Sequence, residues 1–292
     1  MNFIDIASWQ KGIDLASVFR QNDLDGVIIK ATQGLTYVNS EYAAWVKWLT
    51  ENSKPFGVYH YCNGQDAAGE AAHFYETVKP YIGRCVPAAD YEGDALRSGT
   101  GWLKKFLDKF YDLSGVKCLV YCSQSVTQEQ DFTAIAGDGY KLWVAQYADM
   151  NPVNGFLAHP WQKGSVKPFD GYVMQQYASC GRLKGWSGNL DFDLFNGTVE
   201  DWDKLCAKSS AHETPATPPA SLKPADPSIV LRTLKNEFGI GTERVIKLRE
   251  LGYDPASVQK KINLLYVIGG KVKQDIGNET AYWNSILWIA RS

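Results

Sequence analysis

Two acidic residues, Asp90 and Glu92, stand two positions apart in the segment VPAADYEGD. In an extended backbone, side chains two residues apart point to the same face, so both carboxyl groups are expected to enter one cavity. Hydrolysis of a glycosidic bond uses such a pair: one protonated carboxyl donates to the leaving oxygen, and an ionised one stabilises positive charge at the sugar ring. A like charge nearby raises the pKa of one member, so a crowded pair can supply both forms.

Spacing alone also fits a solvated strand end at this segment. The context favours an acidic pocket, because Asp5 lies in the apolar run FIDIA and Asp191 lies between Leu190 and Phe192. A carboxylate buried in such a run costs on the order of several kcal/mol unless it is paired or hydrogen-bonded. Structural pairing of Asp5 with Lys30 is the alternative.

Short apolar or β-branched runs alternate with amphipathic segments before residue 209. Repeats of apolar residues at intervals of three and four predict helices at 40–53, 69–81 and 99–114. Such alternation predicts a mostly parallel sheet joined by crossover helices. The eight predicted strands are residues 3–7, 26–30, 57–61, 86–90, 117–121, 142–146, 172–176 and 190–192.

The sheet is predicted to close into a barrel. An open dinucleotide-binding sheet uses a glycine-rich turn at a strand–helix junction, and neither GxGxxG nor GxxxxGK occurs at one here. In such barrels the working side chains project from the carboxyl ends of the strands, and we expect the polar residues at these ends to converge. They are Asp5, Lys30, His60, Asp90, Glu92, Tyr121, Gln146, Gln175, Gln176 and Asp191.

A stretch rich in Pro, Ala, Ser and Thr, residues 209–228, is predicted to be a linker. It divides a barrel domain at 1–208 from a small all-α domain at 229–292. Within the tail, helical periodicity over 231–265 is broken at Gly239 to Gly241 and at Gly252 to Pro255, which predicts three short helices.

The composition argues against several classes of protein. The formal net charge of −2 gives no long-range attraction to nucleic acid or anionic lipid. No apolar run approaches the roughly 20 residues that span a membrane, and the start MNFIDIASWQ lacks the pattern of a secretory signal. The six cysteines have no metal-ligand spacing and are expected to be reduced, partly buried thiols.

Eight blocks, in order and spacing, resemble the glycoside hydrolase family 25 muramidases, which are common among phage endolysins and bacterial autolysins. The resemblance covers residues 1 to about 206. It implies a flattened, TIM-like β/α barrel that hydrolyses the β-1,4 bond between N-acetylmuramic acid and N-acetylglucosamine, without a metal or organic cofactor. The blocks are DIASWQKGID, VIIKATQG, GVYHY, AADYEG, LVYCS, LWVAQY, MQQYA and LDFDLFNG.

The resemblance implies roles for individual residues. Glu92 matches the general acid and Asp90 its partner carboxylate, while Asp5 and Asp191 match the acids of the first and last strands. Whether Asp90 is the nucleophile or orients the substrate's acetamido group stays open. The substrate-binding candidates, on blocks that line the sugar groove in the family or at a strand end, are Tyr59, Tyr61, Tyr121, Gln176 and Lys30.

The chain departs from the family pattern at two positions. Gln33 stands where the family commonly has Glu, so one outer acid becomes a neutral amide. Asp193 stands where Asn is usual, two residues after Asp191. This extra carboxylate either raises the pKa values of the pocket or points into solvent, and the solvent orientation is the favoured interpretation.

In the tail, residues 238–263 resemble the three-helix wall-binding repeat at the end of some phage lysins, called the CW_7 or Cpl-7 repeat. Where many members have Trp-Gly-Asn-Gly, this chain has Phe238-Gly239-Ile240-Gly241. The final segment AYWNSILWIARS, residues 281–292, is predicted to be an apolar helix that packs on the repeat, forms a dimer seam or contacts the barrel. A small helical domain without a ligand is the alternative.

The predicted function is therefore an endolysin-type lysozyme, with peptidoglycan in the barrel groove and a wall component at the tail. Oligomerisation through the tail is an option, and neither a nucleic-acid partner nor membrane insertion is expected. The expected location is the host bacterial cytoplasm until lysis, with release through a pore protein to the wall. The alternatives are an inactive carbohydrate-binding protein on the same barrel and a chitinase-like glycosidase, although the run of Asp residues ending in Glu that a chitinase would show is missing.

Overall fold

In a computed structural model, the chain forms two compact units, Met1–Glu213 and Thr214–Ser292. The boundary between them falls within the predicted linker. The structure describes residues 1–208, 223–235, 237–238, 244, 247–248, 251–255 and 257–262. The breaks predicted at Gly239 to Gly241 and the helix predicted at 281–292 lie outside the described residues.

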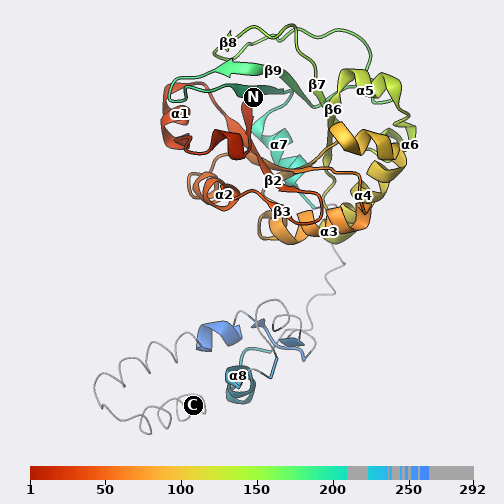
Figure 1. The fold of residues 1–292 in the computed structure, drawn as a ribbon. Helices are drawn as coiled ribbons and strands as arrows, with labels where there is room; N and C mark the ends of the chain where they lie inside the picture. Colours follow the sequence, from red (N-terminus) through yellow and green to blue (C-terminus); the bar gives the residue numbers. More distant parts are fainter. Residues whose placement is uncertain are drawn as a thin grey trace. The chain divides into compact units, whose positions relative to one another are not determined.

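The first unit is a closed barrel of eight strands with helices around it (Figure 1). Neighbouring strands of the barrel are parallel except around β10, which runs antiparallel to both β9 and β1. Two-residue strands, β3 (Tyr37–Val38) and β8 (Val153–Asn154), extend the sheet. The barrel strands are β1 (Asn2–Ile6), β2 (Gly26–Gln33), β4 (Phe56–Tyr61), β5 (Val86–Asp90), β6 (Leu119–Ser123), β7 (Lys141–Ala145), β9 (Met174–Arg182) and β10 (Leu190–Phe195).

The helices of this unit bury one apolar face each against the strands. In α4 the buried residues recur at three and four positions, and the helix ends at Gly115, whose left-handed backbone (φ 73°) lets its N–H donate to the Tyr111 carbonyl at 2.8 Å. The helices are α1 (Leu15–Gln21), α2 (Tyr42–Glu51), α3 (Ala67–Val78), α4 (Gly99–Ser114), α5 (Gln124–Glu129), α6 (Thr133–Gly137) and α7 (Val199–Cys206). Short 3₁₀ turns occupy Ser8–Gln10, Lys79–Tyr81 and Gly93–Ser98.

Alternate residues of each strand point into and out of the barrel. Outward residues join the large core beneath the helices, whereas inward residues form a second apolar cluster inside the barrel. The helix α7 contributes to this inner cluster: Trp202 lies 4.4 Å from the ring of Phe3 and 5.1 Å from that of Phe195, centroid to centroid. Because Phe3 is near the start of β1, α7 closes the end of the barrel opposite to the carboxyl end of that strand.

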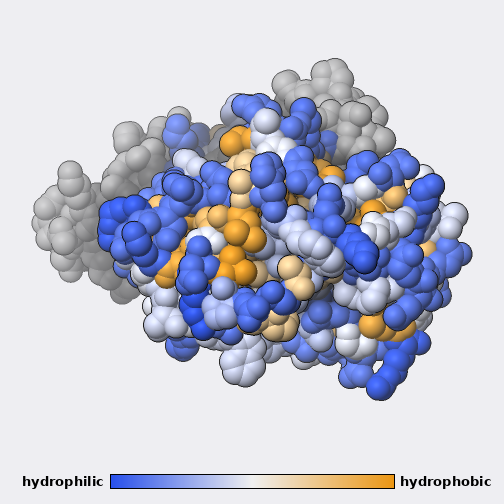
Figure 2. All heavy atoms as spheres, turned by 90° about the horizontal axis from the view of Figure 1, so that it is seen from above, coloured by the Kyte–Doolittle hydropathy of each residue, from blue (hydrophilic) through white to orange (hydrophobic). Residues whose placement is uncertain are grey.

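All eight predicted strands are present, and the predicted closed α/β barrel is confirmed. The expectation for the last strand was incomplete, because β10 runs against its neighbours rather than parallel to them. Among the described residues, no helix is long and apolar enough to cross a membrane. On the face shown in Figure 2, apolar residues appear as patches set among hydrophilic ones.

The second unit has an apolar core of its own around α8 (Pro227–Leu234). Asp226 caps this helix by accepting from the backbone N–H of Ser228 and Ile229, and it also accepts a 2.6 Å bond from the Tyr253 hydroxyl. The ring of Phe238 is buried in this core beneath the guanidinium of Arg232. Phe238 therefore has a packing role in this unit.

Candidate active site

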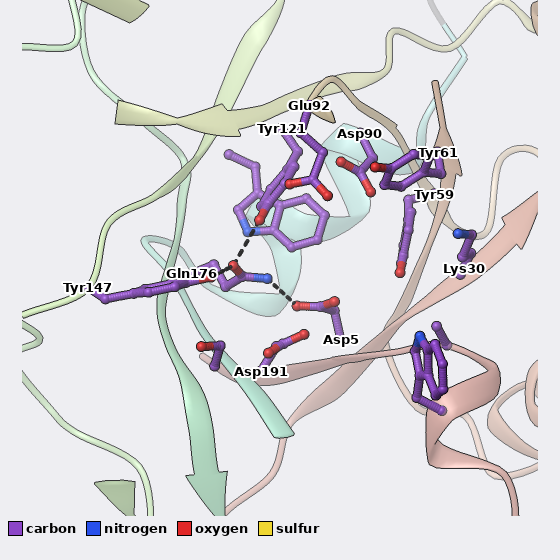
Figure 3. A pocket seen from close by; sticks show the side chains of 14 residues that line it. Asp5, Lys30, Tyr59, Tyr61, Asp90, Glu92, Tyr121, Tyr147, Gln176 and Asp191 are labelled. Atoms are coloured by element: carbon purple, nitrogen blue, oxygen red, sulfur yellow. Dashed lines mark hydrogen bonds between the residues drawn. The ribbon is translucent and has the colours of Figure 1, made fainter. Parts of the chain in front are cut away.

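A cavity of about 300 Å³ opens at the end of the barrel where β1 and β5 finish. Its lining includes every catalytic and substrate-binding candidate from the sequence, brought together from seven strands and the turn after β5 (Figure 3). These candidates are Asp5, Lys30, Tyr59, Tyr61, Asp90, Glu92, Tyr121, Gln176 and Asp191. The remaining lining residues are Ala7, Trp9, Trp143, Tyr147 and Ser179.

The pairing of β1 with β10 brings the first and last acids together. Asp5, near the end of β1, is the register partner of Asp191, near the beginning of β10. Asp191 therefore reaches the cavity from the amino-terminal part of its strand, because β10 is antiparallel. Burial and the neighbouring Asp191 raise the pKa of Asp5 well above its usual value, whereas burial and Glu92 raise the pKa of Asp191 to about 6.

Gln176 fixes the orientation of Asp5. Its Nε2 donates to Oδ2 of Asp5 at 2.7 Å, and its Oε1 accepts from the hydroxyl groups of Tyr121, at 2.9 Å, and of Tyr147. The amide is 4% exposed and lies on β9, next to β10. A buried amide with both ends bonded holds its partners in one geometry, which is the condition for a preorganised site.

Asp90 enters the cavity from the end of β5, and Glu92 enters it from two positions further along the chain. The backbone at Glu92 is extended (φ −149°, ψ −177°), so the alternation of the strand continues and both carboxyl groups face the same space, as predicted (Figure 3). Gly93 then turns the chain with a φ of 57°, and a Cβ there would lie 2.8 Å from the Tyr61 hydroxyl. This glycine lets Tyr61 approach the backbone beside Glu92.

Both carboxyl groups of this pair are partly withdrawn from water. Asp90 is 7% exposed, and its Oδ1 is buried with no hydrogen-bond partner among the described residues. Burial, followed by the charge of Glu92, raises the pKa of Asp90 well above its usual value. Burial also raises the pKa of Glu92, and the positive charge of Lys30 opposes the rise in both residues.

Lys30 is the one cation among the described residues that line the cavity. Its Nζ donates to Oε1 of Gln33 at 2.6 Å and lies 4.4 Å from the centroid of the Tyr61 ring. Gln33 donates in turn to Asn63 at 3.2 Å. These contacts replace the ion pair between Asp5 and Lys30 that was considered from sequence, so that alternative is wrong.

The solvent orientation expected for Asp193 is also wrong. Its side chain is 0% exposed and accepts a 2.8 Å hydrogen bond from Nε1 of Trp143, inside the barrel. Asp193 and Asp191 are two apart on β10, so the alternation that places one inside the barrel places both there. Burial and the charges of Asp5 and Asp191 raise the pKa of Asp193 well above its usual value.

Two of the polar strand-end residues, His60 and Gln175, point away from the cavity, and a third, Gln146, lines an adjoining one. His60 is fully buried on the outward face of β4, where it bonds Thr32 at 2.8 Å and Glu70 at 2.9 Å. Gln175 bonds the backbone carbonyls of Gln146 and Trp161, again on the outward side. Strand parity, which the sequence shows, separates His60 and Gln175 from the residues that enter the cavity.

A second cavity of about 470 Å³ adjoins the first one. Glu92, Tyr121 and Tyr147 line both, so Glu92 stands where the two meet. The lining of the second cavity is completed by Ser123, Gln124, Ser125, Ala145, Gln146, Asp149 and Met150. A groove with an acid at its middle suits a long substrate that is cleaved internally.

Trp9 and Tyr147 also line the cavity, although neither was predicted as a site residue from the sequence. Trp9 follows β1 in a 3₁₀ turn and is 89% exposed at the rim of the first cavity. An exposed indole at a cavity rim offers a flat apolar face to a sugar ring. The signal available in the sequence was the position of Trp9 just beyond the end of the first strand.

Taken together, five carboxyl groups lie in or directly beneath one cavity that has a single lining cation among its described residues. Mutual repulsion and burial prevent all five from being ionised at once. Some therefore carry a proton at mildly acidic pH while others are charged. Such a site supplies an acid and a base to a bound substrate at the same time.

Comparisons with known proteins agree with this geometry. Residues 4–186 match the sequence model described as Glycosyl hydrolases family 25. The autolytic lysozyme of Clostridium acetobutylicum is 29% identical over 67% of this chain, and the lysozyme of Streptococcus phage Cp-7 is 25% identical over 89% of it. The matches span 56% and 69% of those two relatives, respectively.

Solved structures show the same barrel. The catalytic domain of the endolysin ply40, from a bacteriophage of Listeria monocytogenes, is 26% identical and superposes with a TM-score of 0.56, covering 70% of this chain and 97% of that domain. The lysozyme of Streptomyces coelicolor, at 20% identity, gives a TM-score of 0.58 over 70% of this chain and 96% of its own, a likeness of fold.

Proposed function

The chain belongs to glycosyl hydrolases family 25, and we propose that it is an endolysin-type lysozyme that hydrolyses the β-1,4 bond between N-acetylmuramic acid and N-acetylglucosamine in bacterial peptidoglycan. Similarity to lysozymes of bacteriophages and to an autolytic lysozyme supports this substrate. The observation that carries the proposal is the position of Glu92, half-buried beside Asp90, where two adjoining cavities meet.

Glu92 acts as the general acid in this proposal. A substrate lying along both cavities places a glycosidic oxygen beside Glu92, whose raised pKa favours the protonated form. The proton passes to the leaving oxygen as the bond from that oxygen to the anomeric carbon breaks. Water then adds its hydroxyl to the anomeric carbon and returns a proton to Glu92, which restores the acid.

Asp90 supplies negative charge next to the anomeric carbon. Its carboxyl group lines the cavity, and its Oδ1 has no partner among the described residues, so no protein donor to this oxygen competes with a group of the substrate. Two uses fit: attack on the anomeric carbon to form a covalent intermediate, or orientation of the substrate's acetamido N–H. Asp5 and Asp191, on the other side of the cavity in Figure 3, add negative charge that stabilises the positive transition state.

The tail serves as a wall-binding module in this proposal. The similarity to the Cp-7 phage lysozyme covers 89% of the chain and therefore reaches beyond residues 4–186 of the family match. The second unit has its own apolar core, which suits an independent binding module. An enzyme of this type accumulates in the host cytoplasm and reaches the wall at lysis through a pore that another protein makes.

Digestion of purified peptidoglycan tests the activity. Mass spectrometry of the products should find each new reducing end on N-acetylmuramic acid. A reducing end on N-acetylglucosamine would contradict the proposed bond. If no reducing ends appear, the inactive carbohydrate-binding barrel is correct, and turnover of chitin without turnover of peptidoglycan would favour the chitinase-like alternative.

A further inference from the structure

Asp193 is a buried acid with no direct place in the mechanism above. It lies on β10 opposite Phe3 of β1 and beside Gln176 of β9. One carboxyl oxygen, Oδ1, accepts from Trp143 at 2.8 Å, while Oδ2 is buried with no donor among the described residues. An ionised carboxylate is poorly accommodated there, because a buried acceptor without a donor is destabilising, and more so when it is charged.

The titratable groups that face Asp193 give its charge no support. From β1 comes Asp5 and from β10 itself Asp191, while the hydroxyl of Tyr147, in the segment after β7, lies within electrostatic range. Two of these groups are acids. Asp5 pairs with Asp191 and Phe3 with Asp193, so Asp5 and Asp193 are diagonal neighbours on two paired strands. Both are acceptors when ionised, but a proton on Asp193 allows a hydrogen bond between them that lowers the pKa of Asp5.

We propose that Asp193 is a proton-carrying positioning residue, whose neutral carboxylic acid donates through Oδ2 to Asp5, orients Asp5 in the cavity and favours its ionised form. Asp5 is then held from two sides, by Gln176 and by Asp193. Asp193 itself is anchored by Trp143, which donates to the oxygen that carries no proton. The catalytic part of this inference rests on the proposed function, whereas the protonation of Asp193 does not.

The protonation state is tested on the full chain by thermal unfolding of the wild type and of Asp193→Asn at about pH 4 and about pH 7.5. Asparagine keeps an N–H donor for Asp5 and an oxygen acceptor for Trp143, but it cannot ionise. Folded Asp193 holds its proton while the unfolded chain releases its own near pH 4, so wild-type stability falls as pH rises through this window. The variant lacks this loss of stability. The difference in unfolding midpoint, variant minus wild type, should therefore be about 5 °C larger at the higher pH than at the lower pH.

The donor to Asp5 is tested by activity against peptidoglycan. Asp193→Leu removes the donor, so the pKa of Asp5 should rise and the acidic limb of the pH–activity profile should move to higher pH, with kcat lower by about tenfold or more. Asp193→Asn should restore most of that loss and return the limb toward its wild-type position. A limb that moves equally in both variants would overturn the positioning role.

A direct observation separates this inference from the proposed function. In a ¹³C spectrum of the wild-type protein, the Asp193 carboxyl carbon should show the shift of a protonated acid at neutral pH. An ionised Asp193 at neutral pH, or a midpoint difference that does not change with pH, would refute the inference even if the enzyme cleaves peptidoglycan. A protein that cleaves no peptidoglycan but shows a protonated Asp193 would leave the proton assignment standing and refute the enzymatic proposal.

Discussion

Nε2 of Gln176 donates a 2.7 Å hydrogen bond to Oδ2 of Asp5, joining residues 171 positions apart in the sequence. The same amide accepts from Tyr121 and Tyr147, so one neutral side chain sets the geometry of an acid and two tyrosines. Sequence similarity suggested that Gln176 binds the substrate. The structure gives it a positioning role as well, since its amide bonds Asp5, Tyr121 and Tyr147.

Gln176→Leu should lower kcat by at least about tenfold and reduce the free energy of unfolding by roughly 1–3 kcal/mol, because three buried polar groups lose their partner. Turnover of peptidoglycan and urea unfolding measure the two effects. Gln21→Leu, which removes only an exposed bond to Ser17, is the matched control. Unchanged turnover in Gln176→Leu would show that Asp5 needs no such support.

Glu92→Gln should keep the fold and lose at least about a thousandfold in turnover, because an amide of the same shape cannot donate a proton as an acid does. The release of reducing ends from peptidoglycan measures the loss, and circular dichroism checks the fold. Glu129→Gln, on the exposed surface of α5, is the control. Substantial residual turnover would mean that another acid protonates the leaving group.

Asp191→Asn should make stability less dependent on pH between about pH 4 and pH 6. Folded Asp191 keeps its proton up to a pKa of about 6, above the value of 3.8 expected when it is unfolded, so rising pH destabilises the wild type across this range. By pH 7 the variant should gain about 3 kcal/mol relative to the wild type. Unfolding midpoints of both proteins are measured across this range. If the two midpoints changed with pH in the same way, the raised pKa of Asp191 would be disproved.

Trp9→Ala should raise KM by about five- to tenfold and leave stability unchanged, because the indole is 89% exposed and its proposed partner is the sugar. Trp9→Phe keeps an aromatic face and should recover most of the affinity. Trp161→Ala removes another exposed indole that lines neither cavity and serves as the control. Equal KM values for Trp9→Ala and the wild type would exclude stacking at this rim.

A shortened chain that ends at Ala207, just after α7, should hydrolyse soluble peptidoglycan fragments at the full rate but lyse whole cells several-fold more slowly. A tethered binding module raises the local concentration of the enzyme at the wall, and removing it loses that gain. Turbidity of a cell suspension and fragment turnover are measured in parallel. If both proteins lyse cells equally, the tail does not target the enzyme.

Local patterns in the sequence determined much of the barrel. Alternation of apolar residues located its eight strands, and the two-residue spacing of Asp90 and Glu92 placed both in one cavity, because side-chain direction along a strand depends only on neighbouring residues. The same rule places His60 on the opposite face of β4 from Tyr59 and Tyr61. His60 was nevertheless predicted to converge with the other polar residues at the strand ends.

Relations between strands were decided by the tertiary structure. The reversed direction of β10, its register with β1 and the hydrogen bonds of Gln176 depend on pairings between residues far apart in the chain. Asp193 illustrates the difference: alternation along β10 puts it on the same face as Asp191, but only the closed barrel, with Trp143 and Asp5 inside it, makes it a buried acid. Side-chain alternation is a local property, whereas burial and protonation depend on what the rest of the chain places opposite.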